Sequence, residues 1–312
     1  MGGLVMMIRN KRVLYIVLLA ILTVVMAGCG SSASSKAKMV QGKVNVVTSF
    51  YPLYEFTRNI GGEYVNAINL VPAGVEPHDW SPKSRDIKNM TQAQVFVYQG
   101  AGFEGWVEDF LGSLSGDSTL KVVEASKGAD LIKTTENKEE YDPHAWLSPL
   151  NAVKMANNIK IALIEADPAH KDVFEQNYTN YAAKLTDLNA RYKKEIALTS
   201  KKEIAVSHHA FAYLCRDYGL TQMSIMGLSP DAEPTAQDLK KMNEFLKEHG
   251  LKYIFFEELV SDKLAKTLAK DAKVDTMVLN PIEGLTDEQM KAGKDYISIM
   301  DENLKNLVIA LQ

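Results

Sequence analysis

The chain has 312 residues, 35 of them basic and 39 acidic, and its formal net charge at pH 7 is −4. This balance lacks the basic excess of nucleic-acid-binding proteins, so we expect no nucleic-acid partner. The length allows two ordinary domains or one large one.

Residues 1–28 have the pattern of a secretory signal, because a basic cluster over 9–12 precedes an apolar run over 13–27. Small residues stand directly before Cys29, which resembles the lipobox of bacterial lipoproteins, where the signal is cleaved and the cysteine is acylated. Residues 29–43 would then form a lipidated polar tether. The alternatives are an incidental cysteine or a transmembrane anchor, although about 15 apolar residues fall short of the roughly 20 that a span needs. We expect an extracytoplasmic, lipid-anchored protein, and the tether favours a Gram-positive surface.

Patterns of strands and helices alternate over residues 44–166, which predicts an N-terminal lobe built around a parallel sheet. Buried strands are expected where short apolar runs end at proline or glycine. The predicted strands cover 44–50, 65–71 and 94–98, and the predicted helices cover 53–60, 84–93 and 105–114.

Residues 167–199 predict a linking helix. Asp167 and Pro168 are typical of an N-cap and a first helical position. Apolar residues spaced by three and four then continue from Phe174 to Ile196, which predicts one helix over about 169–198. A helix of this length measures roughly 45 Å and suits a rigid connector.

The alternation of strands and helices returns over residues 200–312 and predicts a C-terminal lobe. Its strands are expected over 203–207, 252–256 and 276–279, and its helices over 209–218, 235–249, 261–272 and 296–311. The predicted fold class is therefore α/β, with two parallel-sheet lobes joined by one long rigid helix.

Four of the six histidines follow predicted strands, namely His78, His144, His208 and His209. The first two stand in a repeated pattern of acid, proline, histidine, any residue, tryptophan. Ligands gather beyond the carboxyl ends of parallel strands, and the neighbouring acids Glu76 and Asp142 could orient the imidazole rings. One such histidine would be incidental, but the repeat favours a metal site.

Five segments together resemble the zinc- and manganese-specific solute-binding lipoproteins of bacterial ABC importers (the cluster A-I family), and within them the zinc subgroup. These segments are 72–80, 142–146, 207–213, 229–235 and 279–283. The resemblance covers nearly the whole chain after the signal. It implies two α/β lobes joined by one long helix, with the metal site in the cleft between the lobes.

The resemblance also implies the metal ligands, which by motif are His78, His144, His208 and Glu283. In the family, the ligand is followed by one residue of any type and then by alanine and phenylalanine. His208 fits this pattern and His209 does not, so the resemblance selects His208. Glu257 and Glu258 are rival carboxylates, since they also follow a strand. Otherwise, Glu257 is expected to form hydrogen bonds near the site.

The implied ligand set favours Zn²⁺ over Mn²⁺, because imidazole suits zinc whereas oxygen-rich sites suit manganese. The manganese members carry glutamate where His208 stands. The stretch 133–140 is charged but has no histidine. We therefore expect no zinc-collecting loop of the kind that many zinc members carry.

The resemblance implies a monomeric receptor, not an enzyme, that captures Zn²⁺ and delivers it to an ABC permease driven by a separate ATPase. The chain has no GxxxxGK[ST] phosphate loop of its own, consistent with a separate ATPase. One alternative is a manganese receptor of the same type. Another is a zinc hydrolase with Glu283 as general base, but no HExxH run occurs and full ligation would leave no catalytic water. An adhesin and a heme or siderophore receptor are further alternatives.

Overall fold

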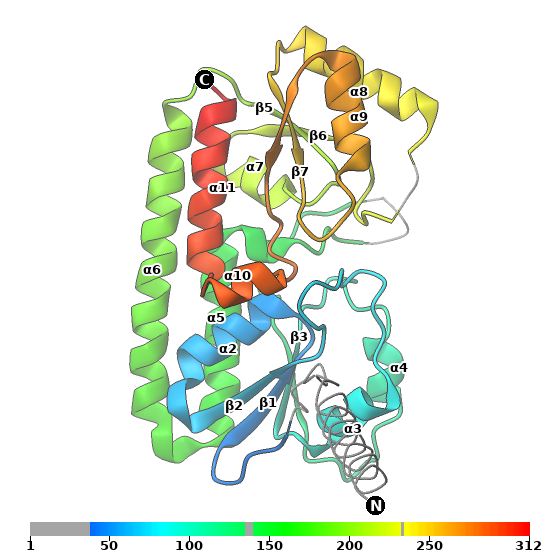
Figure 1. Ribbon diagram of the computed structural model, residues 1–312. Coiled ribbons are helices and arrows are strands. Elements are labelled where there is room, and N and C mark those ends of the chain that lie inside the picture. The colour runs from blue at the N-terminus through cyan, green and yellow to red at the C-terminus, as the bar shows by residue number, and fades with distance from the viewer. Residues whose placement is uncertain (1–37, 135–139, 232–233) are drawn as a thin grey trace, which may run out of the picture. The chain divides into compact units, whose positions relative to one another are not determined.

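Two four-stranded parallel sheets organise the chain (Figure 1). They are seen in a computed structural model that describes residues 38–134, 140–231 and 234–312. The predicted signal, Cys29 and the tether before residue 38 lie outside the described residues. In the described part of the chain, every helix is too short or too polar to cross a membrane.

The N-terminal sheet has the strand order β2-β1-β3-β4. Its strands are β1 (Val44–Thr48), β2 (Val65–Asn69), β3 (Val95–Tyr98) and β4 (Lys121–Glu124). The helices of this lobe are α2 (Tyr51–Gly61), α3 (Ser84–Gln92), α4 (Val107–Gly112) and α5 (Pro149–Ala166). Side chains alternate between faces along a strand. Val46 therefore packs in the cluster that contains α2 and α5, whereas Val47 packs in the cluster that contains α3 and α4.

The C-terminal sheet repeats this plan with the order β6-β5-β7-β8. Its strands are β5 (Glu203–Val206), β6 (Thr221–Ser224), β7 (Tyr253–Phe256) and β8 (Asp275–Val278). Its helices are α7 (Ala212–Tyr218), α8 (Ala236–Glu248), α9 (Lys263–Ala272), α10 (Asp287–Lys291) and α11 (Tyr296–Ala310). Ala205 and Ile254 face α8 and α9, while Val206 and Phe255 face the opposite layer.

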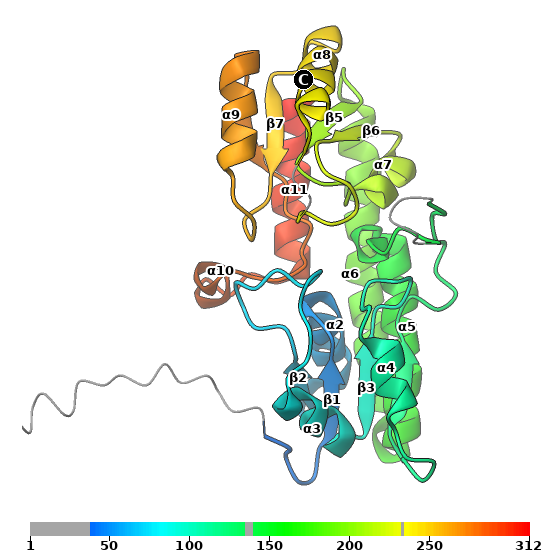
Figure 2. The ribbon, with the colours of Figure 1, turned by 90° about the vertical axis from the view of Figure 1, so that its right-hand side faces the viewer.

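The long helix α6 (Lys171–Ala197) has 27 residues and therefore measures about 40 Å. It packs against α2 and α5 of the first lobe and against α7 and α11 of the second. Figures 1 and 2 show it running past both sheets. The predicted fold class, two parallel-sheet lobes with one long helix, is confirmed.

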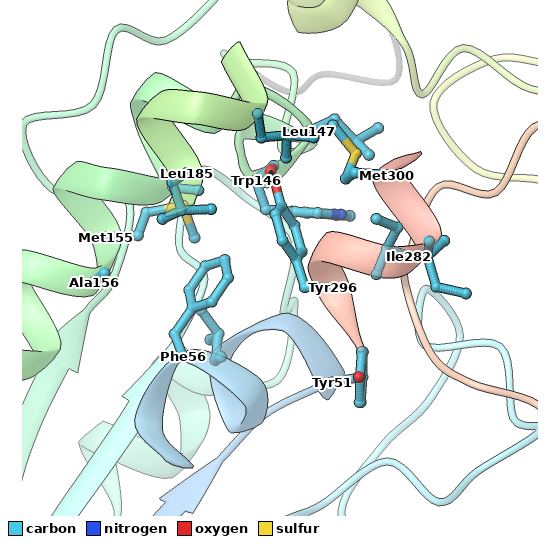
Figure 3. Packing of buried hydrophobic residues seen from close by; sticks show 14 of the residues in the cluster. Tyr51, Phe56, Trp146, Leu147, Met155, Ala156, Leu185, Ile282, Tyr296 and Met300 are labelled. Atoms are coloured by element: carbon cyan, nitrogen blue, oxygen red, sulfur yellow. Dashed lines mark hydrogen bonds between the residues drawn. The ribbon is translucent and has the colours of Figure 1, made fainter. Parts of the chain in front are cut away.

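One continuous hydrophobic core serves both lobes (Figure 3). It contains Phe56 of α2, Met155 of α5, Leu185 of α6 and Met300 of α11. Tyr296, at the start of α11, packs edge-on against Phe56 with ring centroids 5.2 Å apart. A wide hinge opening would expose this shared core to water, which is unfavourable.

Several predicted elements differ in detail from the structure. The region of Asp167 is a short 3-10 turn, Pro168–His170, and the Asp167 carboxylate pairs with the His170 ring at 2.6 Å instead of capping the helix. Helix α7 begins at Ala212, not at residue 209, because the preceding residues form a turn in which the Ala210 N–H donates to the His208 carbonyl. The strands β4 and β6 and the helices α5 and α10 were not among the predicted elements.

Candidate metal centre

Four side chains that were singled out in the sequence meet between the two sheets. His78 follows β2, His144 stands directly before a 3-10 turn (Ala145–Leu147) in the chain after β4, His208 follows β5 and Glu283 follows β8. One ligand atom of each lies within 4.8 Å of the others, and no second such group of histidine, cysteine and carboxylate side chains occurs among the described residues. Three of the four residues are buried and His78 is nearly so. The chain after β2, β5 and β8 and the 3-10 turn at Ala145–Leu147 thus place two candidate ligands from each lobe in one group; contrary to expectation, His144 does not stand at a strand end.

Five of the six distances among the four ligand atoms match a tetrahedral zinc site. Glu283 Oε1 lies 3.3 Å from His78 Nε2, 3.3 Å from His144 Nε2 and 3.4 Å from His208 Nε2. His144 Nε2 also lies 3.3 Å from each of the other two nitrogens. A regular tetrahedron whose centre-to-corner distance is about 2.0–2.1 Å, as for zinc with nitrogen and oxygen ligands, has edges of about 3.3–3.4 Å. One Zn²⁺ therefore fits at the centre of the four atoms.

Two carboxylates set the orientation of two of the rings. Asp142 Oδ1 accepts hydrogen bonds from both the His144 backbone N–H, at 2.9 Å, and the ring Nδ1, at 2.8 Å. Glu257 Oε1 lies 2.6 Å from His208 Nδ1 and also accepts the Ser207 hydroxyl at 2.6 Å. A carboxylate can only accept, so each Nδ1 carries a proton, which leaves each Nε2 as the ring nitrogen that can bind a metal ion.

The remaining predicted residues lie beside the group, not within it. Glu76 Oε2 accepts the backbone N–H of His78 at 2.9 Å, so it holds the loop and not the imidazole. His209 Nδ1 is directed to the Ser224 hydroxyl at 3.4 Å. Glu258, a rival carboxylate, accepts the side-chain amide of Asn280 at 2.6 Å. The other rival, Glu257, stands behind the His208 ring, as described above.

Glu283 is held by a turn with an unusual backbone. Ile282 has φ = 57°, a left-handed conformation that β-branched residues rarely adopt. Its N–H donates to Asn280 Oδ1 at 2.7 Å, and Asn303 of α11 accepts the Asn280 N–H at 2.8 Å and donates to the Asn280 carbonyl at 2.7 Å. The surrounding contacts thus fix a strained turn that presents Glu283.

The loops that carry the ligands of opposite lobes are also tied together directly. The Gly74 N–H, in the loop before His78, donates to the Leu285 carbonyl at 2.9 Å. Phe103 packs edge-on against the His78 ring, with centroids 4.9 Å apart. The hydrogen bond holds the N-terminal loop against the segment that carries Glu283, and the Phe103 contact steadies the His78 ring within its own lobe.

The electrostatics of the group favour a bound cation. Burial opposes ionisation of Glu283, but the surrounding histidines outweigh it and hold the pKa of Glu283 well below its ordinary value. Burial likewise opposes charge on His208, yet the Glu257 carboxylate raises the pKa of His208 to about 10. The same balance between burial and Asp142 raises the pKa of His144. In the absence of metal, His208 is therefore a cationic imidazolium at neutral pH, with a second proton on Nε2. A metal ion that binds Nε2 must displace this proton.

The sequence did not predict that the Asn280–Ile282 turn would position Glu283. The turn acts through its backbone conformation and through amide hydrogen bonds, and its residues are neither metal ligands nor titratable groups. Its one sequence signal was the asparagine before proline in the segment 279–283, a pattern that favours turn formation. Trp146 is the last residue of the repeated histidine pattern, and the pattern alone indicates no role for it. The segment 133–140 falls mostly outside the described residues, as do residues 232 and 233 of the segment 229–235.

Known proteins resemble this chain over most of its length. Residues 46–310 match the family described as ZnuA, zinc-uptake complex component A, periplasmic. The zinc-binding lipoprotein AdcA of Streptococcus pneumoniae is 41% identical over 287 residues, covering 88% of this chain but only 57% of AdcA. The high-affinity zinc uptake system protein ZnuA of Bacillus subtilis is 42% identical over 294 residues, covering 90% of this chain and 92% of that protein.

A solved structure shares the fold of this chain. The crystal structure of the Zn(II)-bound ZnuA-like domain of S. pneumoniae AdcA superimposes with a TM-score of 0.77 and 41% identity, covering 86% of this chain and 99% of that domain. The chain therefore corresponds to the ZnuA-like part of AdcA and spans little more than half of the whole protein. With the match over residues 46–310 and the two-lobed fold, this chain belongs to the ZnuA family of zinc-uptake binding proteins.

Proposed function

We propose that this protein is an extracytoplasmic receptor that captures Zn²⁺ with His78, His144, His208 and Glu283. The observation that carries the proposal is the convergence of three imidazole nitrogens and one carboxylate oxygen at tetrahedral spacing. Three imidazoles with one carboxylate suit zinc better than manganese. The relatives named as zinc-binding AdcA and zinc-uptake ZnuA support the same metal.

Capture exchanges a proton for a metal ion. On zinc binding, His208 loses the proton on Nε2, and the Glu283 carboxylate supplies negative charge to the ion. Asp142 and Glu257 act from behind the rings, since each keeps a proton on Nδ1 and strengthens Nε2 as a donor to the metal. Because one core runs through both lobes, we expect loop adjustments rather than wide lobe closure on binding.

The proposal describes a binding protein, not an enzyme. A catalytic zinc usually has three protein ligands and an open position for water. Here Glu283 Oε1 lies 3.3–3.4 Å from the three nitrogens, the spacing of a fourth tetrahedral ligand. Glu257 and Asp142 are hydrogen-bonded to the Nδ1 atoms of His208 and His144. With four protein ligands, zinc would have no position left for a nucleophilic water.

Delivery and location extend the same proposal. The bound zinc would pass to an ABC permease served by a separate ATPase, in keeping with the ZnuA family. Acylation of Cys29 would tether a monomeric receptor to the outer face of the cell membrane, as the lipoprotein name of AdcA suggests. We propose the boundaries 1–28 for the signal, 29–43 for the tether, 44–166 and 200–312 for the lobes, and 167–199 for the linking helix.

The experiment is metal analysis of the purified protein after exposure to equimolar Zn²⁺ and Mn²⁺. We expect one zinc per chain in the wild type and loss of stoichiometric zinc in His208→Ala. His209→Ala is the matched control, because His209 adjoins His208 but contacts Ser224 instead of the group. Stoichiometric manganese in the wild type would refute the zinc assignment, and zinc retained by His208→Ala would refute the ligand set.

A further inference from the structure

Trp146 stands two residues after His144 and completes the motif Asp-Pro-His-Ala-Trp, yet it offers no atom to the metal group. Its side chain is fully buried. The indole Nε1–H donates a hydrogen bond of 2.7 Å to the carbonyl oxygen of Pro281. Pro281 stands two residues before Glu283. One hydrogen bond therefore joins the segment that carries a ligand of the first lobe to the segment that carries the acid ligand of the second.

The surroundings keep the indole in this position. The Tyr296 hydroxyl of α11 donates to the Trp146 carbonyl at 2.5 Å, which fixes the backbone. The indole ring packs against the rings of Phe50, Phe103 and His144, with centroid distances of 4.7, 5.2 and 5.2 Å. Contacts on several sides therefore direct the N–H to Pro281.

The acceptor of this hydrogen bond, the Pro281 carbonyl, belongs to the strained turn that presents Glu283. Pro281 is followed by Ile282, whose left-handed backbone is strained, and then by Glu283. A buried carbonyl that loses its donor is costly, so the turn would shift to find another partner. A shift of the turn would move the Glu283 carboxylate away from the three nitrogens.

We infer that Trp146 is a positioning residue, whose indole N–H holds the turn 280–283 in place so that Glu283 stands at tetrahedral spacing before zinc arrives. The inference rests on the proposed ligand set. A purely structural tryptophan would stabilise the core, and its loss would affect zinc binding equally with or without Glu283. A positioning residue acts through Glu283, and its effect disappears when that ligand is absent.

The test is a double-mutant cycle on the zinc dissociation constant, measured by competition with a chelating dye. Trp146→Phe keeps an aromatic ring but removes the donor to Pro281. We expect this change to raise the zinc Kd about tenfold in the wild-type background, as loss of an orienting partner does. In the Glu283→Ala background we expect less than about a twofold further change, because contacts that act as one unit are not additive.

The matched control is Tyr192→Phe. Tyr192 is also fully buried in the shared core, and its hydroxyl donates 2.7 Å to the carbonyl of Met300 in α11. The control removes a comparable buried hydrogen bond that does not reach the ligand loops. We expect a lower melting temperature with an unchanged zinc Kd.

Each outcome decides one point. A wild-type Kd in Trp146→Phe, or an equal weakening in both backgrounds, would overturn the positioning role while leaving the receptor proposal intact. Unchanged zinc affinity in Glu283→Ala alone would overturn the ligand set, and the positioning role with it. If Trp146→Phe fails to fold, Tyr296→Phe replaces it in the cycle, because it removes only the hydroxyl that fixes the Trp146 backbone. The same non-additivity with Glu283→Ala is then expected, and its absence would overturn the inference.

Discussion

Glu257 Oε1 lies 2.6 Å from Nδ1 of His208, on the side of the ring that faces away from the four converging ligand atoms. This pairing raises the pKa of His208 to about 10, even though burial opposes the charge. Glu257 follows a strand as Glu283 does, so the sequence presents both as carboxylate candidates for the metal. The geometry separates them, because one faces the group and the other supports an imidazole from behind.

Zinc binding is expected to release protons at neutral pH. His208 with a pKa of about 10 is protonated near pH 7.5, and a metal-bound imidazole is not. Each proton released makes the zinc affinity rise about tenfold per pH unit until the pH reaches that pKa. Titration calorimetry in buffers of different ionisation enthalpy should give about one proton released per zinc at pH 7.5. A value of zero would contradict the protonated state of His208.

The stability of the metal-free protein should change with pH in the opposite sense. The folded pKa of His208 is raised above its unfolded value of about 6.5. The contribution of His208 to stability is therefore fully present below about pH 6.5 and is lost as the pH rises to about 10. Urea unfolding of the metal-free protein at pH 6.5 and pH 9 should show a smaller pH-dependent loss in Glu257→Gln than in wild type. An identical loss in both would show that Glu257 does not set this pKa.

Glu257→Gln should weaken zinc binding by about 10–100-fold, the usual cost of losing a partner behind a metal-bound histidine. The amide can still accept from Nδ1 but no longer supplies charge, so His208 becomes a weaker donor. The zinc Kd at pH 7.5 measures this effect. Glu55→Gln is the control, since Glu55 is also buried but contacts Tyr51 and Asn59 and not the ring. Equal effects in the two variants would argue against a specific role for Glu257.

Asn280→Ala should raise the zinc Kd about tenfold. The change removes the side chain that accepts the Ile282 N–H and so frees the strained turn that presents Glu283. Asn306→Ala provides the comparison, because Asn306 donates to the Val278 carbonyl in β8 and does not touch the turn. We expect the control to bind zinc as the wild type does. If both variants bind equally well, the turn is not what positions Glu283.

Zinc should raise the thermal stability of the protein. At a free concentration of a thousand times Kd, a ligand that binds only the folded state adds about 4 kcal/mol, which corresponds to a rise of roughly 8 °C in Tm for a chain of this size. Differential scanning fluorimetry with and without Zn²⁺ measures the shift, and His208→Ala should lose most of it. A similar shift in His208→Ala would place the stabilising zinc elsewhere.

The sequence was sufficient to predict much of this fold, for identifiable reasons. The strands β1, β3, β5 and β7 are central, so both faces are buried and they read as continuous apolar runs. The edge strands β4 and β6, with the sequences KVVE and TQMS, have polar residues at half or more of their positions, and they were not predicted. Their existence depends on pairing with a neighbour, which no local pattern records.

The ligands of the candidate site could be predicted from the sequence, but the contacts that position them could not. The repeated motif pointed to His78 and His144, whereas the family resemblance was needed to choose His208 over His209 and to add Glu283; the structure brings these four side chains together. The strained backbone of Ile282 and the contact of Trp146 with Pro281 could not be predicted. Both depend on where the two lobes place their loops relative to one another, and that is set by the shared core around α6 and α11.

X-ray absorption at the zinc edge of the one-zinc protein tests whether His78, His144, His208 and Glu283 hold the ion tetrahedrally. We expect four nitrogen and oxygen neighbours at about 2.0–2.1 Å, with outer-shell scattering from three imidazoles. Glu283→Ala should then change the oxygen contribution and leave the imidazole scattering in place. A shell containing sulfur, a six-coordinate shell of oxygens, or a spectrum that is identical in Glu283→Ala would refute this ligand set.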